Sequence, residues 1–307
     1  IRNKEIKPFL ATYNGKLGSG DGQFSLLSLN FSLLSLVAPV PSGINGYFDL
    51  NGKYSLGNGG PEVIAELVIK DTKIYDKNII LDKGKILLKD NYLKFDIALR
   101  EKSSINPVLL KGEFPLSNSL PIDLKLESHG DGLAFLTGLT KGSVSWLSGT
   151  ADLSLLIRGT PAKPLANGFF VLKNSSLLLQ GKEIENLNST IVFDFNRLEV
   201  RNLMANIAPN GVINSSGGVS LFESQFTESE PLTLSIEKTS LKTEFTDVII
   251  SSNIIFKGSI LKPQLAGEVF ISEGSISAKR SNNSGKSSSR KQELNKSSAL
   301  SKVRQFP

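Results

Sequence analysis

The fold is decided by residues 161–221, PAKPLANGFFVLKNSSLLLQGKEIENLNSTIVFDFNRLEVRNLMANIAPNGVINSSGGVSL. Apolar and polar residues alternate along this stretch, and Asn and Gly residues separate the alternating runs. One run sets Ile191 and Phe193 against Thr190 and Asp194. A period of two residues is typical of a β-strand with one apolar face and one wet face. The stretch therefore predicts a succession of half-buried strands joined by turns.

The opening of this stretch recurs twice in the chain. The positions four, six, eight, ten and thirteen residues after Pro164 hold Gly168, Phe170, Leu172, Asn174 and Leu177. The same offsets give Gly267, Val269, Ile271, Glu273 and Ile276 after Pro263, and Ala65, Leu67, Ile69, Asp71 and Ile74 after Pro61. Pro61 and Pro164 are 103 residues apart, and Pro164 and Pro263 are 99 residues apart. These spacings predict a long, repetitive sheet.

Charge and composition exclude several classes of protein. The net charge is +6, but residues 279–307 hold eight Lys or Arg and one Glu, so residues 1–278 are nearly neutral, at −1. The body therefore lacks the basic stripe that nucleic-acid binding requires, and no nucleic-acid partner is expected. The chain has no Cys, which excludes disulfides, thiolate metal sites and cysteine nucleophiles. The Ser- and Lys-rich residues 279–307 are expected to be disordered.

No membrane-spanning helix is predicted. The most apolar window, residues 25–40, is interrupted by Ser and Asn, whereas a spanning helix needs about 20 predominantly apolar residues. The chain begins at Ile1 and no signal peptide precedes the body, so we expect a fragment of a longer protein whose membrane anchor lies elsewhere. Within this window, residues 25–37 fit the spacing of a short helix and of a strand equally well.

Turn residues and Leu spacing predict the remaining local structure. Residues 17–24 are expected to form a tight turn between two strands. Further turns are predicted at Asn51-Gly52, at residues 82–84 and at Asp90-Asn91. Leu residues three apart in 131–141 predict one short helix that plugs or caps an end of the sheet.

Reactive groups are too scarce to predict an enzyme. His129 is the one histidine and lies in an expected exposed turn, without the nucleophile and third group of a triad. Several acidic residues occupy the polar positions of the alternating runs, as expected for a solvent-exposed face of a sheet: Asp96, Asp123, Asp194, Glu199 and Glu237. Trp146 and the Phe residues are expected to fill a core or groove. We predict no catalytic residue, no metal site and no cofactor, with a polysaccharide-active β-helix enzyme as a remote alternative.

Three segments together resemble the C-terminal region of the TamB family, which belongs to the AsmA-like superfamily. Family members show an opening G-T-x-x-x-P-x-x-x-G-x followed by an apolar residue, then a set of strands, then another such opening. Here these segments are Gly159–Leu172, Leu187–Leu221 and Gly258–Ile276. The resemblance covers residues 143–278 well, extends to 43–142, and is absent from the tail. The Asn- and Lys-rich, Cys-free composition is similar to the cyanobacterial branch.

The resemblance implies an all-β fold: a long curled antiparallel or mixed sheet forming an open half-pipe with a hydrophobic groove. Residues 1–142 would form a β-rich groove segment, residues 143–278 the TamB-like repeats, and residues 279–307 the tail. The following residues would line the groove: Leu67, Ile69, Phe95, Ile97, Phe170, Leu172, Ile191, Phe193, Phe195, Leu198, Val200, Leu234, Ile236, Val269 and Ile271.

The function implied is that of a translocation and assembly module, or bridge-like lipid transfer protein. Such a protein passes phospholipid along its groove and supports outer-membrane protein assembly. Its partners would be phospholipid acyl chains, an outer-membrane barrel assembly protein and the inner membrane, the last two through regions outside this chain. The expected location is the periplasmic part of the cell envelope. A structural β-solenoid or adhesin-like stalk with a closed, dry core has the same alternation and remains open.

Overall fold

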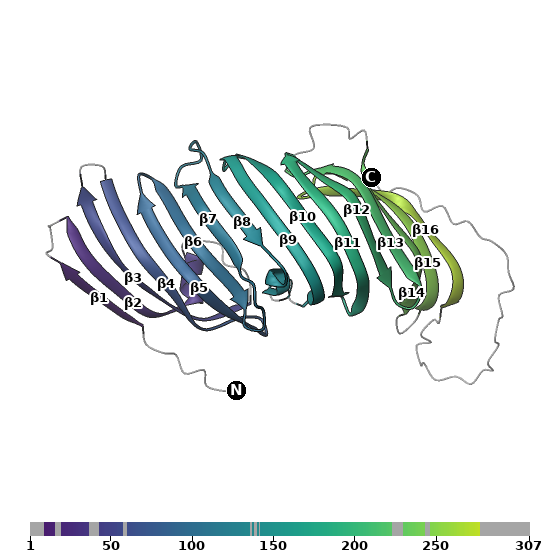
Figure 1. The fold of residues 1–307 in the computed structure, drawn as a ribbon, viewed down its shortest axis with the longest axis horizontal. Coiled ribbons are helices and arrows are strands. Elements are labelled where there is room, and N and C mark those ends of the chain that lie inside the picture. Colours follow the sequence, from purple (N-terminus) through teal and green to yellow (C-terminus); the bar gives the residue numbers. More distant parts are fainter. Residues whose placement is uncertain are drawn as a thin grey trace, which may run out of the picture.

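The chain folds into one sheet. A computed structural model describes residues 9–15, 20–36, 43–57, 60–135, 137, 140, 142–222, 230–242 and 246–276. Its sixteen strands lie in chain order, each hydrogen-bonded to the next, and Figure 1 shows them as one long curved layer with β1 and β16 at opposite ends. The predicted disordered tail, residues 279–307, lies outside the described residues.

The strands and short helices have the following bounds. The first half contains β1 (Leu10–Gly15), β2 (Asp21–Asn30), the 3-10 helix η1 (Phe31–Leu36), β3 (Ile44–Gly57), β4 (Gly60–Ile74), β5 (Lys77–Lys89), β6 (Tyr92–Glu101), β7 (Val108–Pro115), β8 (Asp123–Ser128) and the 3-10 helix η2 (Gly132–Phe135). The second half contains β9 (Val144–Thr160), β10 (Lys163–Leu179), β11 (Lys182–Phe195), β12 (Arg197–Ile207), β13 (Gly211–Ser220), β14 (Leu232–Lys242), β15 (Thr246–Gly258) and β16 (Pro263–Ile276).

Every pair of neighbouring strands is antiparallel, as expected for strands joined by short turns. The predicted all-β class and the open, curled sheet are confirmed, because β1 and β16 do not pair to close a barrel. The sheet also continues across residue 142, where β8 pairs with β9. Asp90 and Asn91 form the predicted turn between β5 and β6, both with positive φ.

The sequence repeat corresponds to six strands. Its three origins lie at the starts of β4, β10 and β16. In the second and third copies the preceding glycine stands at the same place in a hairpin: Gly159 pairs with Pro164, and Gly258 pairs with Pro263. The φ angles of these glycines are 85° and 80°. A Cβ at Gly159 would also meet the carbonyl oxygen of Lys163, so this turn requires glycine.

Two predicted turns were wrong. Asn51-Gly52 lies inside β3, and residues 82–84 lie inside β5. Gly52 is opposite Phe24, and a Cβ there would meet the Phe24 ring, so the glycine permits a close approach between strands rather than a reversal. At residues 82–84 the register between β5 and β6 shifts, which marks a β-bulge.

Two short elements depart in detail from the predictions. Residues 25–37 contain both of the expected alternatives, because β2 runs to Asn30 and η1 follows it. The helix expected at 131–141 is present as the four-residue η2. Both Leu133 and Ala134 of η2 are buried, and Leu133 belongs to the core cluster on the apolar face of the sheet.

Most strands are bent by bulges. The register shifts within nine of the fifteen strand pairs. Several bulges contain a residue with positive φ, among them Asp71, Asn174, Asn186 and Lys238. A bulge adds one residue to one strand, bends that strand and increases its twist. The curvature in Figure 1 therefore has a local origin in the middle of the strands.

Small residues occupy the apolar face where the strands bend. Ala151 and Ser175 are fully buried, and Ser189 and Ala205 are 2% and 3% exposed. The serine hydroxyls donate to main-chain carbonyl groups: Ser175 to Thr150 at 3.1 Å and Ser189 to Asn202 at 3.1 Å. Bulges interrupt the ladder, and these hydroxyls satisfy carbonyl oxygens beside the interruption.

Candidate functional site

All fifteen residues predicted to line a groove lie on one face of the sheet. Directly opposite residues in an antiparallel pair share a face, so the registers carry the assignment from strand to strand. Ile86 is opposite Phe95, for example, and Phe170 is opposite Ile191. The fifteen residues come from β4, β6, β10, β11, β12, β14 and β16. We call this side the apolar face.

The apolar face is only partly covered by described residues. Leu172 and Val200 are buried, at 8% and 5% exposure, within clusters of apolar residues. Val269 and Ile271 on β16 are 62% and 63% exposed, and Phe195 is 56% exposed. The other ten predicted residues are half-buried. The face therefore presents a large apolar surface with room for further apolar contacts.

Sequence reasoning missed part of this face. Strands β7 to β9 contribute five half-buried residues by the same alternation: Leu110, Leu124, Leu126, Leu153 and Leu155. The signal that could have found them is the period-two pattern used for the other strands. The buried small residues at the bends could not be predicted in this way, because a Ser at an apolar position of the alternation looks like an interruption of the pattern.

The opposite side is a charged face. Its residues form ion pairs between neighbouring strands, such as Lys94–Glu113 at 2.7 Å and Lys89–Glu62 at 2.9 Å. The five acidic residues considered as catalytic candidates all lie on this face by register: Asp96, Asp123, Asp194, Glu199 and Glu237. Exposed pairs of this kind contribute little to stability.

The remaining candidate residues are not grouped into a site. The His129 ring is 64% exposed and its Nδ1 lies 3.2 Å from a carboxylate oxygen of Asp152. Trp146 packs against the core cluster on the apolar face. Within the described ranges, no three His, Cys, Asp or Glu residues are placed to hold a metal ion.

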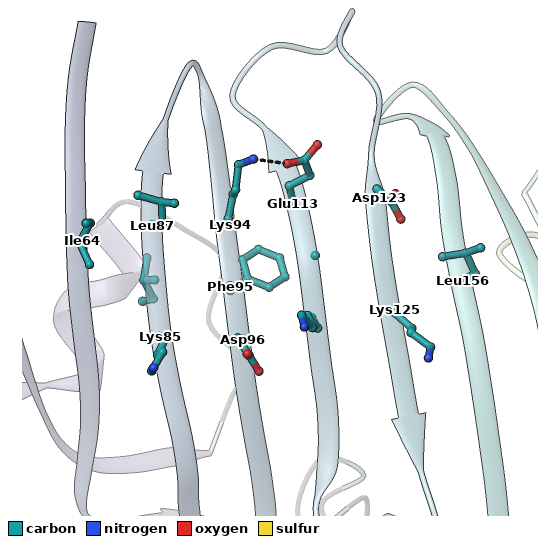
Figure 2. A pocket seen from close by; sticks show the side chains of 13 residues that line it. Ile64, Lys85, Leu87, Lys94, Phe95, Asp96, Glu113, Asp123, Lys125 and Leu156 are labelled. Carbon is teal, nitrogen blue, oxygen red and sulfur yellow. Dashed lines mark ion pairs between the residues drawn. The ribbon is translucent and has the colours of Figure 1, made fainter. Parts of the chain in front are cut away.

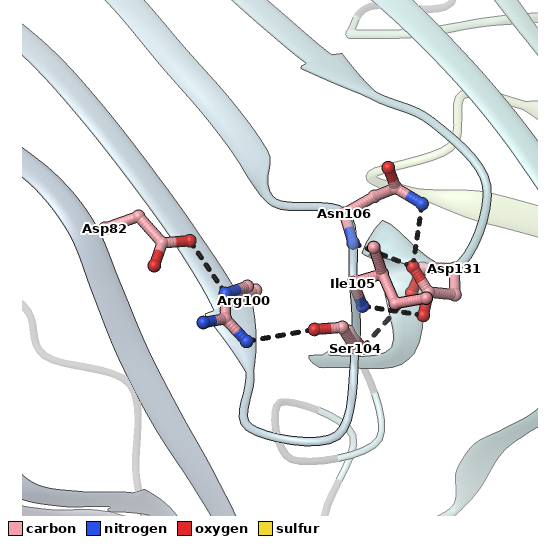
Figure 3. A network of polar contacts seen from close by, with 6 residues as sticks. All are labelled: Asp82, Arg100, Ser104, Ile105, Asn106 and Asp131. Atoms are coloured by element: carbon pink, nitrogen blue, oxygen red, sulfur yellow. Dashed lines mark hydrogen bonds and ion pairs between the residues drawn. The ribbon is translucent and has the colours of Figure 1, made fainter.

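A polar network ties η2 to the connection between β6 and β7 (Figure 3). The Asp131 carboxylate accepts hydrogen bonds from the main-chain N–H groups of Ile105 and Asn106 at 2.9 and 3.0 Å, and from the Asn106 side chain at 3.0 Å. Burial raises the pKa of Asp131, but these three donors outweigh it, and the net pKa is lowered. Arg100 extends the network by donating to Asp82 and to the Ser104 carbonyl. The network holds η2 against the apolar face.

This geometry defines a class: an open antiparallel sheet with one continuous apolar face and one charged face. A large part of its exposed surface is apolar. No helix in the described part of the chain is long and apolar enough to cross a bilayer.

Comparison with known proteins finds similarity to one family. The TamB C-terminal domain matches residues 201–305. Protein TIC236, a chloroplastic protein of Arabidopsis thaliana, is 24% identical over 157 residues, which make up 50% of this chain and 7% of that protein. No solved structure matches the chain. These two matches support the resemblance to the TamB family, and the chain spans a small part of the length of the relative it matches.

Proposed function

We propose that this chain is part of an envelope-spanning TamB-like protein that holds phospholipid acyl chains on its apolar face and lets them move along it. The observation that supports this proposal is the continuity of the half-buried apolar face from β4 to β16. Burial of an acyl chain contributes about 0.8 kcal/mol per CH₂. A face that is apolar along its whole length gives similar contacts at each step, so a chain can move without a chemical reaction.

The wider role follows from the family. We propose that the protein lies in the periplasmic part of the envelope, is not an enzyme, and supports outer-membrane protein translocation and assembly. Its partners in that role would be an outer-membrane barrel assembly protein and the inner membrane, contacted through other regions of a longer protein.

The proposal is tested by measuring bound lipid. The purified chain is extracted and its phospholipid content determined by mass spectrometry, for the wild type and for Phe170→Lys. Phe170 is half-buried on the apolar face, and a charge there removes apolar contact and adds a group that must be solvated. We expect the substitution to lower the amount of bound lipid at least threefold, which is about the effect of losing the contact with one apolar side chain.

A matched variant on the other side controls for general damage. Phe169 is adjacent in sequence, lies on the charged face and is 44% exposed, so Phe169→Lys should leave bound lipid unchanged. A wild-type chain without lipid, with strong exchange protection throughout the apolar face, would instead support a structural stalk with a dry core.

A further inference from the structure

One edge of the sheet, at β16, has no partner strand among the described residues. β16 pairs with β15 on one side only. It has 14 residues, whereas β1 at the opposite edge has six. All residues from Pro263 to Ser275 are exposed, and they include four large apolar side chains: Leu265, Val269, Phe270 and Ile271. A long exposed edge presents unpaired main-chain N–H and C=O groups that can pair with a further strand.

The repeat shows how such a strand would lie. β15 pairs with β16 as β9 pairs with β10, because nine consecutive residue pairs recur 99 residues later. β10 also pairs with β11 on its other side. Ala166 and Leu172 of β10 are 4% and 8% exposed, whereas the equivalent Leu265 and Ile271 of β16 are both 63% exposed. The open edge of β16 is therefore the place that β11 occupies one repeat earlier.

Gly267 indicates which side chain the added strand presents. A Cβ at Gly267 would meet the carbonyl oxygen of Asn253, so this glycine lies close against β15. Other glycines that lie against one neighbouring strand in this way are opposite a large apolar residue on the other neighbour: Gly52 and Phe24, Gly84 and Ile97, Gly112 and Phe95, Gly168 and Phe193, Gly217 and Val200. Figure 2 shows one of these side chains, the Phe95 ring, between β6 and β7. The space beside Gly267 accordingly suits an aromatic side chain.

The residues that follow β16 do not supply this side chain. Ile191 and Phe193 are the apolar pair that β11 places against β10. The positions 99 residues after them hold Arg290 and Gln292, and residues 277–305 contain no aromatic residue. A strand with an apolar residue and an aromatic residue two positions later must therefore come from elsewhere.

We propose that the open edge of β16 binds an extended segment of another polypeptide as an added antiparallel strand, in the register that β11 takes on β10. The segment carries an aromatic residue opposite Gly267 and, two positions earlier, an apolar residue opposite Val269. A basic residue between them is favoured, because it lies opposite Glu268 on the charged face. Main-chain hydrogen bonds supply the affinity, and the alternate side chains supply the specificity. This proposal does not depend on the movement of acyl chains along the apolar face.

The test measures the binding of synthetic peptides to the full chain by fluorescence anisotropy. The parent peptide has the sequence of residues 187–195, LNSTIVFDF. Val192→Lys in this peptide should tighten binding about twofold to fivefold, because the lysine lies opposite Glu268. Phe193→Ser in the peptide should weaken binding at least fivefold, because the aromatic contact beside Gly267 is lost. Amide hydrogen exchange should show added protection in β16 when the parent peptide is bound.

Two variants of the chain test the position of the peptide. Val269→Asp should weaken binding at least fivefold, because it places a carboxylate beside the apolar residue of the peptide. The matched control is Phe195→Asp, which changes a residue of the same apolar face, 56% exposed compared with 62% for Val269, on β11 and away from the open edge. It should leave the dissociation constant within twofold. Circular dichroism checks that each variant retains its sheet.

Several results would overturn the proposal. They are absence of peptide binding by the wild-type chain, equal affinity for the parent and Phe193→Ser peptides, and equal effects of Val269→Asp and Phe195→Asp. Self-association of the chain that the peptide does not reverse would also overturn it, because a second copy of the chain would then occupy the edge.

Discussion

Two buried serines on the apolar face should respond in opposite ways to the same substitution. Ser128 and Ser175 are both fully buried. The Ser175 hydroxyl lies 3.1 Å from the Thr150 carbonyl oxygen and 3.2 Å from that of Lys173. The Ser128 hydroxyl, which lies against Gly132 of η2, has no hydrogen-bond partner among the described residues. Ser→Ala at each position removes the same single atom from an equally buried site.

The expected magnitudes follow from this difference. Ser175→Ala removes a hydrogen bond and leaves a buried carbonyl less well satisfied, so the free energy of unfolding should fall by about 1–2 kcal/mol. Ser128→Ala removes a buried hydroxyl whose desolvation is not compensated, so stability should be unchanged or rise by up to about 1 kcal/mol.

The assay is urea unfolding of both variants beside the wild type. Amide hydrogen exchange provides a local measurement, because a long sheet in which each strand pairs mainly with its two neighbours can unfold in parts. If Ser128→Ala destabilises the protein as much as Ser175→Ala, hydrogen bonding does not explain these serines and the reasoning is refuted.

Two further predictions concern η2 and two glycines with positive φ, Gly168 inside β10 and Gly181 in the turn between β10 and β11. The lowered pKa of Asp131 means that its hydrogen bonds stabilise the fold above the unfolded pKa of about 3.9 and are lost as pH falls through the folded pKa. Asp131→Asn should therefore destabilise by about 1–2 kcal/mol at pH 7, and a difference that persists unchanged below pH 4 would contradict this. Gly168→Ala should destabilise by more than about 2 kcal/mol, since φ is 152° and a Cβ would meet the Ser154 carbonyl. Gly181→Ala, at φ 81° with no neighbour within 4 Å, should cost about 1 kcal/mol, and equal thermal shifts would refute the steric argument.

The sequence predicted the strands and their faces because alternation is a local property. Whether Phe95 and Phe170 point to the same side depends on period-two patterns within each strand and on short turns between them. The six-strand repeat was likewise readable, since the same offsets recur after Pro61, Pro164 and Pro263.

Features that depend on the neighbouring strand could not be predicted. Asn51-Gly52 has the composition of a hairpin turn, yet its glycine accommodates the ring of Phe24 from β2. The arrangement of the charged face depends on exact register, which brings Lys111 opposite Lys125 from a different strand. Side-chain spacing within one strand contains no information about either contact.

The bends also separate the parts of the apolar face that stabilise the fold from those available to a ligand. Ala151 and Ser175 are fully buried at the bends, and the sheet is a single layer, so larger neighbours on the same face must close over them. Phe170, farther along β10, and Phe193 on β11 remain half-buried. A ligand on this face therefore meets the large residues and not the small ones. Enlarging Ala151 to Val should lower stability through overpacking, by about 1–3 kcal/mol, and leave the composition of bound lipid unchanged. Phe170→Lys should instead lower the amount of bound lipid, and it should also cost some stability because the half-buried Phe170 side chain packs against the core cluster.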